Sequence, residues 1–212
     1  INDRLCRGVL CCPFMVDRLR AAGIKPERIH ACWPVVDLKK FRNRGPNGPD
    51  VMNVGAALPK KGMPLFADLA KRCPEIRFDL YMLGYDAVAI ADYAKRIESP
   101  VNIIPPVPFD DMPTEYKKHR WMVYTASKDF NTVGWPLSLA EAQASGVGVL
   151  MQNIRPDLKD YVGPGGYVFD TVEDAYRIIT QPFPEEKREQ GFLQAEKSDV
   201  DSHIGLLFQL WS

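Results

Sequence analysis

Short apolar runs alternate with segments of helical period along most of this chain. The runs have the length and composition of buried strands and cover residues 8–12, 28–32, 51–55, 78–84, 101–105, 121–126, 148–152 and 167–169. Between them the sequence predicts helices near residues 13–22, 63–72, 86–98, 110–118, 137–145, 156–161 and 171–180. Because strands that are apolar throughout must be covered on both faces, the pattern predicts an α/β fold with a doubly wound parallel sheet.

The stretch of residues 41–50 has two Gly, two Pro and no apolar period, so it is the best candidate for a linker. We therefore expect three parts. Residues 1–45 lead into the sheet, residues 46–180 form the sheet domain, and residues 181–212 form C-terminal helices. We expect the apolar face of the last helix (Ile204, Leu207, Phe208 and Trp211) to pack on the chain's own sheet, the alternative being a partner outside it.

Charge and cysteine content exclude several classes of function. The chain has 27 basic and 27 acidic residues, so no net field attracts nucleic acid or an anionic membrane. The five cysteines are odd in number and lack metal-type spacing, which favours buried thiols in a reducing, cytoplasmic compartment. We expect no metal site, and His30, His119 and His203 share no spacing that suggests metal binding or acid–base chemistry.

The first candidate binding turn is "VGAALPKKGMP". In open parallel sheets, ligands bind at the carboxyl ends of strands, where the strand order reverses. Here a strand ends at Gly55, and Lys61 and Gly62 lie at a helix start, so one ammonium and free backbone N–H groups suit a diphosphate. The alternative is a solvated turn in which Lys60 and Lys61 have no role.

A second candidate is the segment "GWPLSLAEAQASG". With Pro136 at the first helical position, the amides of Leu137, Ser138 and Leu139 are expected to remain free for an anion. Glu141 follows about one and a half turns into the helix, where its carboxylate can accept hydrogen bonds from a ribose diol. The alternative is that an acid near a helix start only answers the helix dipole.

Two further loops border the same edge of the sheet. Asp129 and Asn131 can reach a polyhydroxy ligand, although we expect them to make turn hydrogen bonds of their own. The proline-rich loop of residues 104–111 is expected to place Val107 and Phe109 as an apolar slot for a planar base; a rigid connection is the alternative.

Together these motifs resemble the carboxyl-terminal half of the GT-B glycosyltransferases, particularly the retaining family 4. The likeness rests on "MNVGAALPKKG", on "VGWPLSLAEAQASGVGV" and on "LRAAGIKPERIHACWPVVDLKKF", and it covers residues from about 8 to 180. It implies a Rossmann-like domain that binds a nucleotide sugar. Lys61 and the Ser138 and Leu139 amides would contact the diphosphate, Glu141 the ribose, and the Val107 loop the base.

The resemblance also implies an activity, transfer of a hexosyl group to an acceptor hydroxyl with retention and without a cofactor or metal, as in polysaccharide biosynthesis. An amino-terminal acceptor-binding domain would be missing, so we expect this chain alone to be an incomplete, inactive fragment. Any peripheral association with a membrane would involve the missing regions.

Two positions depart from the family pattern. Ala56 replaces a basic residue, the loss of which typically costs about 2–4 kcal/mol of transition-state stabilisation. Val133 replaces the acid that contacts the donor sugar. A non-catalytic scaffold or partner-binding domain is therefore the alternative function, and a sugar-nucleotide epimerase, whose catalytic acids are not found here, ranks last.

Overall fold

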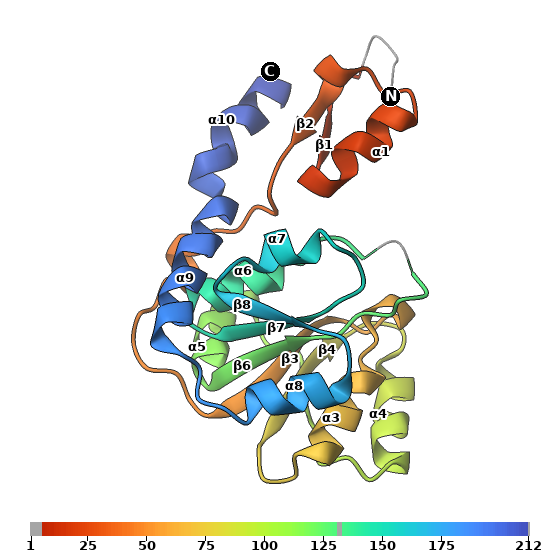
Figure 1. Ribbon diagram of the computed structural model, residues 1–212, viewed down its shortest axis with the longest axis vertical. Helices are drawn as coiled ribbons and strands as arrows, with labels where there is room; N and C mark the ends of the chain where they lie inside the picture. Colours follow the sequence, from red (N-terminus) through yellow and green to blue (C-terminus); the bar gives the residue numbers. More distant parts are fainter. Residues whose placement is uncertain (1–5, 131–132, 212) are drawn as a thin grey trace.

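A six-stranded parallel sheet forms the centre of the computed structural model, which describes residues 6–130 and 133–211. The strands lie in the order β5-β4-β3-β6-β7-β8 (Figure 1). Their bounds are β3 (Asp50–Ala56), β4 (Phe78–Leu83), β5 (Asn102–Ile104), β6 (His119–Tyr124), β7 (Gly148–Gln152) and β8 (Gly166–Phe169). From β3 the chain builds outward in one direction and from β6 in the other, so the strand order reverses between them. The predicted doubly wound sheet is confirmed.

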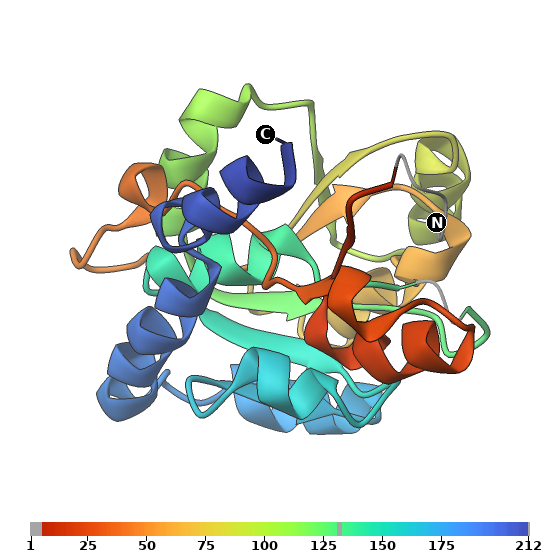
Figure 2. The same cartoon turned by 90° about the horizontal axis from the view of Figure 1, so that it is seen from above.

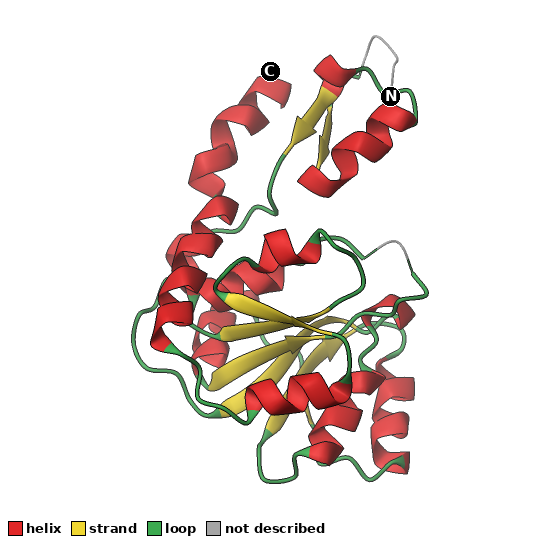
Figure 3. Cartoon of the chain, viewed as in Figure 1, coloured by secondary structure: helices red, strands yellow, loops and turns green. Residues whose placement is uncertain are grey.

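Helices cover both faces of the sheet, as the apolar strands predict (Figure 3). One face carries α3 (Pro64–Arg72), α4 (Ala87–Arg96) and α8 (Val172–Ile179), and the other carries α5 (Met112–Lys117), α6 (Leu137–Ala144) and α7 (Leu158–Val162). Side chains alternate between the two cores along each strand. In β6, Trp121 and Val123 join the α3 side, whereas Met122 and Tyr124 join the α6 side.

A small unit precedes the sheet domain. It contains β1 (Val9–Cys11), η1 (Pro13–Met15), α1 (Val16–Ala21), η2 (Pro26–Arg28) and β2 (Ile29–Ala31), and its two strands form a separate parallel sheet. Figure 2 shows this unit, in red, from above. The four-residue helix α2 (Leu38–Phe41), too short for a periodic signal, was not predicted. The linker after it has no regular structure up to β3; the boundaries at residues 45 and 180 remain predictions.

The C-terminal segment contains α9 (Glu185–Ala195), η5 (Glu196–Ser198) and α10 (Val200–Trp211). The expectation that the last helix packs on the chain's own sheet is wrong. Both faces of the sheet are already covered, and α10 instead extends beside β1 and β2 (Figure 1). Its apolar side chains stay largely exposed, including Phe208 and Trp211 at 64% and 76%. Among the described residues, no helix has the length and apolar character needed to cross a membrane.

Candidate functional site

The ends of β3 and β6 are tied together at the point where the strand order reverses. The turn η3 (Pro59–Lys61) follows β3, and the Lys60 carbonyl accepts a 3.0 Å hydrogen bond from the Ser127 amide. The Thr125 hydroxyl donates to the Lys61 carbonyl at 2.8 Å and accepts from Asn53 at 3.1 Å. The backbone of Lys61 is therefore fixed at the position where parallel sheets bind ligands.

Two predicted glycines differ in how strictly they are required. Gly62 has a φ of 56°, and an added Cβ would lie 3.0 Å from the Ala126 carbonyl carbon, so only glycine fits without strain. At Gly55, near the end of β3, an added Cβ would meet only the Met63 Cε atom at 3.7 Å. Packing does not force glycine at position 55, and its backbone lines the apolar slot described below.

The side chain of Lys61 turns toward the α6 face of the sheet. Its ammonium donates to the hydroxyl of Tyr124, the last residue of β6, and lies 4.8 Å from the centre of that ring. Burial, reinforced by the neighbouring charge of Lys60, lowers the pKa of Lys61 to about 8. Both lysines of the turn are partly buried, but Lys61 is the one whose ammonium contacts Tyr124. The preference for Lys61 over Lys60 as the cation for a ligand stays a prediction.

At the start of α6 the structure corrects the sequence analysis. Pro136 is the residue that flanks the helix, and the helix begins at Leu137. The prediction that the Leu139 amide is free is wrong, since it donates to the Pro136 carbonyl at 3.2 Å. Within the described part of the chain, the amides of Leu137 and Ser138 have no hydrogen-bond partner. Two donors, rather than three, are available to an anion.

Glu141 points into the protein instead of serving as a surface charge. Its carboxylate accepts a 2.8 Å hydrogen bond from the buried hydroxyl of Tyr116 on α5, which also approaches the Ser138 carbonyl at 3.4 Å. Burial raises the pKa of Glu141, and the bond from Tyr116 partly opposes that shift. The interpretation of Glu141 as a mere dipole partner does not account for this inward position.

A third tyrosine supports the start of α6. The Tyr161 hydroxyl, on α7, donates to the Pro136 carbonyl at 2.5 Å, and its ring stacks on Trp135. We call Tyr116, Tyr124 and Tyr161 the tyrosine floor. Each is at most 3% exposed, and each bonds to one part of the candidate site. Sequence analysis missed all three, because buried tyrosines in strands and helices carry no local signal of their partners.

An apolar cavity lies where the slot for a base was predicted, with one change of lining. Val107 lines a cavity of about 170 Å³ together with Gly55 and residues at the ends of β3 and β4. Phe109, which was also expected there, lies elsewhere in the turn η4 (Phe109–Asp111), with its ring against Phe41 and beneath the Lys40 ammonium. Two consecutive prolines, at 105 and 106, extend the chain between β5 and Val107.

In the loop after β6, Asp129 makes turn hydrogen bonds of its own, as expected. Asp129 bonds with Ser127 in both directions at 3.2 Å, through its carboxylate and through its amide. These are turn hydrogen bonds. Asn131 lies outside the described residues.

The two positions that depart from the family pattern have opposite environments. Ala56 is exposed at the end of β3. Val133 is 1% exposed in the core on the α6 side, and its carbonyl accepts a hydrogen bond from Arg155. A longer side chain fits freely at position 56, whereas a carboxylate at position 133 would be buried.

A second group of residues missed by sequence analysis joins the first unit to the site. Trp135 donates to Asp157 at 2.8 Å, and Arg155 pairs with the same carboxylate at 2.7 Å. Phe14 and Trp33, from the first unit and its exit, pack on the Trp135 ring with centroids 5.8 and 4.8 Å away. The sequence "GWP" gave no indication of this aromatic contact.

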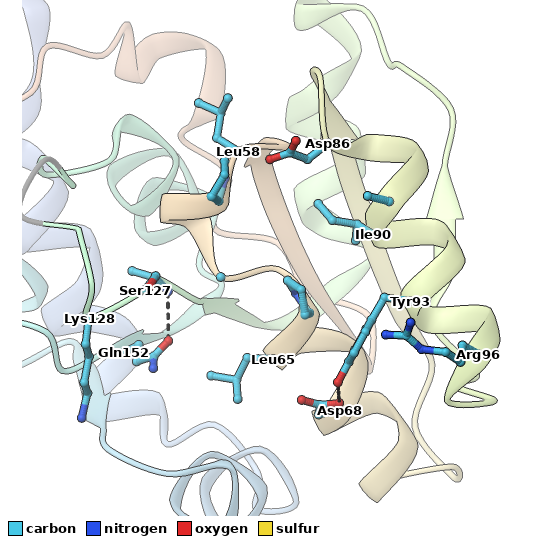
Figure 4. A pocket seen from close by; sticks show the side chains of 15 residues that line it. Leu58, Leu65, Asp68, Asp86, Ile90, Tyr93, Arg96, Ser127, Lys128 and Gln152 are labelled. Atoms are coloured by element: carbon cyan, nitrogen blue, oxygen red, sulfur yellow. Dashed lines mark hydrogen bonds between the residues drawn. The ribbon is translucent and has the colours of Figure 1, made fainter.

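A larger cavity lies beside η3; Gly62 lines it, but Gly55, Lys61, Val107 and the residues of α6 do not (Figure 4). It has a volume of about 720 Å³ and lies between the starts of α3 and α4, with Leu58, Leu65 and Ile90 among its apolar walls. Its recorded hydrogen bonds are internal: Tyr93 donates to Asp68 at 2.7 Å, and the Gln152 side chain accepts from the Ala126 amide at 2.9 Å. Size alone therefore does not identify the site.

Within the described residues, no cluster of three or more His, Cys, Asp or Glu side chains could hold a metal ion. The five cysteines are all free thiols, as expected, but only Cys32 and Cys73 are buried.

Comparison with known proteins gives a match in structure but not in sequence. No protein-family model and no curated protein matches the chain. HepE from Anabaena, solved with UDP and glucose, has a TM-score of 0.77 at 14% identity, over 97% of this chain and 63% of its own. A TarM variant from S. aureus, solved with UDP, has a TM-score of 0.76 at 17% identity, over 97% and 44%.

WaaG, a glycosyltransferase of lipopolysaccharide biosynthesis, has a TM-score of 0.65 at 14% identity, over 89% of this chain and 56% of its own. The chain thus spans about half the length of the solved proteins it matches. At these identities the likeness concerns the fold. This chain has the Rossmann-like fold found in GT-B glycosyltransferases.

Proposed function

We propose that this chain is the donor-binding portion of a retaining glycosyltransferase and that it binds a nucleotide sugar through its diphosphate and ribose. The observation that carries the proposal is the placement of Lys61 and the free Leu137 and Ser138 amides at the reversal of strand order, with Glu141 on the same helix. An ammonium and helix amides suit phosphate oxygens, and a carboxylate suits a hydroxyl pair.

The substrate class has support from the solved structures with this fold. HepE and the TarM variant were both solved with UDP. We therefore take a uridine diphosphate sugar as the first donor to test. The base would enter the slot beside Val107, whose backbone and apolar walls suit a planar ring.

Within this function, the protein's contribution is to stabilise the leaving diphosphate electrostatically, with no metal ion needed in the proposal. The chain spans about half of its structural matches. We propose that an acceptor-binding domain completes the enzyme, that this domain supplies the groups beside the reacting carbon, and that the assembly works in the cytoplasm, as the free thiols favour.

Calorimetry with UDP, GDP and ADP tests the binding function. We expect one of these nucleotides to bind, with affinity lost on Lys61→Ala and on Glu141→Ala. Lys60→Ala is the matched control, because it removes a neighbouring cation from the same turn and should change affinity little. If none of the three nucleotides binds at millimolar concentration, the proposal fails.

A second function, a non-catalytic domain with the same fold, is favoured by Ala56 and Val133. One cation near the diphosphate is lacking, and Val133 faces the core rather than the ligand. Donor turnover by the completed protein separates the two functions. Nucleotide binding without any transfer to an acceptor would favour the non-catalytic domain.

A further inference from the structure

We propose that Tyr124 and Tyr116 are positioning residues, which hold Lys61 and Glu141 in place for the diphosphate and the ribose. The inference rests on the proposed function, but it assigns roles to two side chains that do not contact the ligand themselves. Both belong to the tyrosine floor and come from different elements, β6 and α5.

Tyr124 fixes the direction of the Lys61 side chain. A lysine on a short turn has four rotatable bonds and would normally extend into water. Here the ammonium instead lies against the Tyr124 side chain and donates a hydrogen bond to its hydroxyl. The phenol is 2% exposed and is itself fixed in the core, so it is a rigid acceptor at the reversal of strand order.

Tyr116 fixes the direction of the Glu141 side chain, but as a hydrogen-bond donor, whereas Tyr124 is an acceptor. Its hydroxyl donates to one carboxylate oxygen, Oε2, at 2.8 Å. Among the described residues, the other oxygen, Oε1, has no recorded partner and is the one available to a ribose diol. Because the Tyr116 ring is fully buried against Phe41, it orients the carboxylate without movement.

A neutral partner suits a binding site better than a charged one. A carboxylate beside Lys61 would satisfy its charge and compete with phosphate, whereas a phenol anchors the ammonium and leaves its charge available. Burial raises the pKa of Tyr124, so the phenol stays neutral. The other titratable groups near this pair are Lys60 on η3 and Tyr161 on α7.

The first test measures the Lys61 pKa by NMR on protein labelled at the lysine side chains, without any nucleotide. In Tyr124→Phe the Lys61 titration should move by at least half a pH unit. A downward shift would mean a buried ammonium that has lost its acceptor, and an upward shift would mean a side chain released to water. An unchanged titration would overturn the role of Tyr124. The matched control is Tyr93→Phe, which removes a hydroxyl bonded to Asp68 on the far side of η3.

The second test pairs each variant with a truncated ligand. Tyr124→Phe should weaken UDP binding about tenfold but leave uridine binding unchanged, because uridine has no phosphate for Lys61. Tyr116→Phe should weaken UDP about tenfold yet have no effect on the 2′,3′-dideoxy analogue of UDP, which lacks the diol. Equal losses for full and truncated ligands would mean that the tyrosines act only through general stability, and would overturn the proposal.

The two proposals can fail separately. If no nucleotide binds but the Lys61 pKa moves in Tyr124→Phe, the proposed function is wrong and the contact between the two side chains is real. If UDP binds and both phenylalanine variants bind it normally, the function stands and the positioning roles are wrong.

Discussion

Buried charges at the two edges of the sheet differ in how many hydrogen-bond partners the protein gives them. At the amino edge, Asp79 is 2% exposed and receives hydrogen bonds from Arg77, Asn102 and His119 at 3.0, 2.8 and 3.1 Å. Those contacts lower the pKa of Asp79 despite its burial. Other groups of the protein therefore provide the hydrogen bonds that the Asp79 carboxylate needs.

Lys117, on the same amino edge, is also surrounded by acceptors, although burial and the nearby Arg188 lower its pKa to about 8. Its ammonium donates to four oxygens at 2.7–3.1 Å, two of them carbonyls of the linker, at Asn43 and Gly45, and another the carbonyl of Ser145. At the carboxyl edge, by contrast, Lys61 and Glu141 each have one side-chain partner within the described residues, and it is a neutral phenol. Charges that stabilise the fold are saturated, whereas those of the candidate site retain capacity for a ligand.

The largest expected effect is a loss of stability on removal of a buried carboxylate that is fully hydrogen-bonded within the protein. Asp79→Ala should lower the free energy of unfolding by about 3–5 kcal/mol, because it leaves the buried His119 without its acceptor and breaks the pair with Arg77, which then has only Asp50 at 3.7 Å. Urea denaturation measures the loss. UDP binding by the variant that remains folded should be unchanged, and a specific loss of binding would break the distinction between the two edges.

An acid introduced at position 133 should also destabilise. Val133→Glu restores the family's residue type but buries a carboxylate in the core, at a cost of about 2–4 kcal/mol. Thermal unfolding checks this, with Val133→Leu as a control of similar bulk and no charge. Tighter UDP binding with unchanged stability would mean that position 133 faces the ligand after all.

Removing the cation of the site should affect binding instead of folding. Lys61→Met should weaken UDP binding by about 1.5–3 kcal/mol, the range for a hydrogen bond to a charged group. The free energy of unfolding should stay level or increase, because a partly desolvated charge has been removed. Calorimetry and urea denaturation are measured on the same samples, and a loss of stability comparable to that of Asp79→Ala would contradict the comparison.

The pH dependence of binding should report Lys61 directly. The pKa of Lys61 in the free protein is about 8, and a bound diphosphate favours the charged form. The affinity for UDP should therefore be highest well below pH 8, where Lys61 is already protonated. Above that pH, binding must take up a proton, and affinity should fall by up to about tenfold per pH unit. Lys61→Met should abolish the slope between pH 7.5 and 9.5; a slope that persists in this variant would assign the titration to another group.

The smallest expected effect is a gain in the affinity for UDP. Ala56→Arg adds the second cation at an exposed position that has room for it, and should strengthen UDP binding by about 1 kcal/mol without a change in stability. Ala56→Gln provides a control of similar length without charge. No gain in affinity for the arginine variant would mean that position 56 does not face the diphosphate.

Much of the fold was predictable because it depends on local patterns. Apolar runs and their breakers located the strands and most helices, and Gly62 and the Lys61 turn followed from spacing alone. The position of the last helix could not be obtained in this way. An amphipathic pattern shows that α10 has an apolar face, but not which surface that face approaches.

The candidate site was predictable in the residues proposed to face the ligand and not in their support. Lys61 stands out at a helix start after a strand, and Glu141 stands out as the single acid in the helix of residues 137–144. Tyr116 and Tyr124 resemble any other core residue, and their partners are distant in sequence, 25 and 63 positions away. The same holds for Leu139, whose amide partner depends on where the helix actually begins.

The most direct measurement of the central claim is an NMR titration of the isotopically labelled chain with UDP. The amides of Gly55, Leu137 and Ser138 should shift together with a single affinity, while those of Asp79 and His119 at the opposite edge stay in place. Shifts confined to the cavity between α3 and α4, or no shifts at millimolar UDP, would contradict the assignment of the carboxyl edge as the nucleotide site.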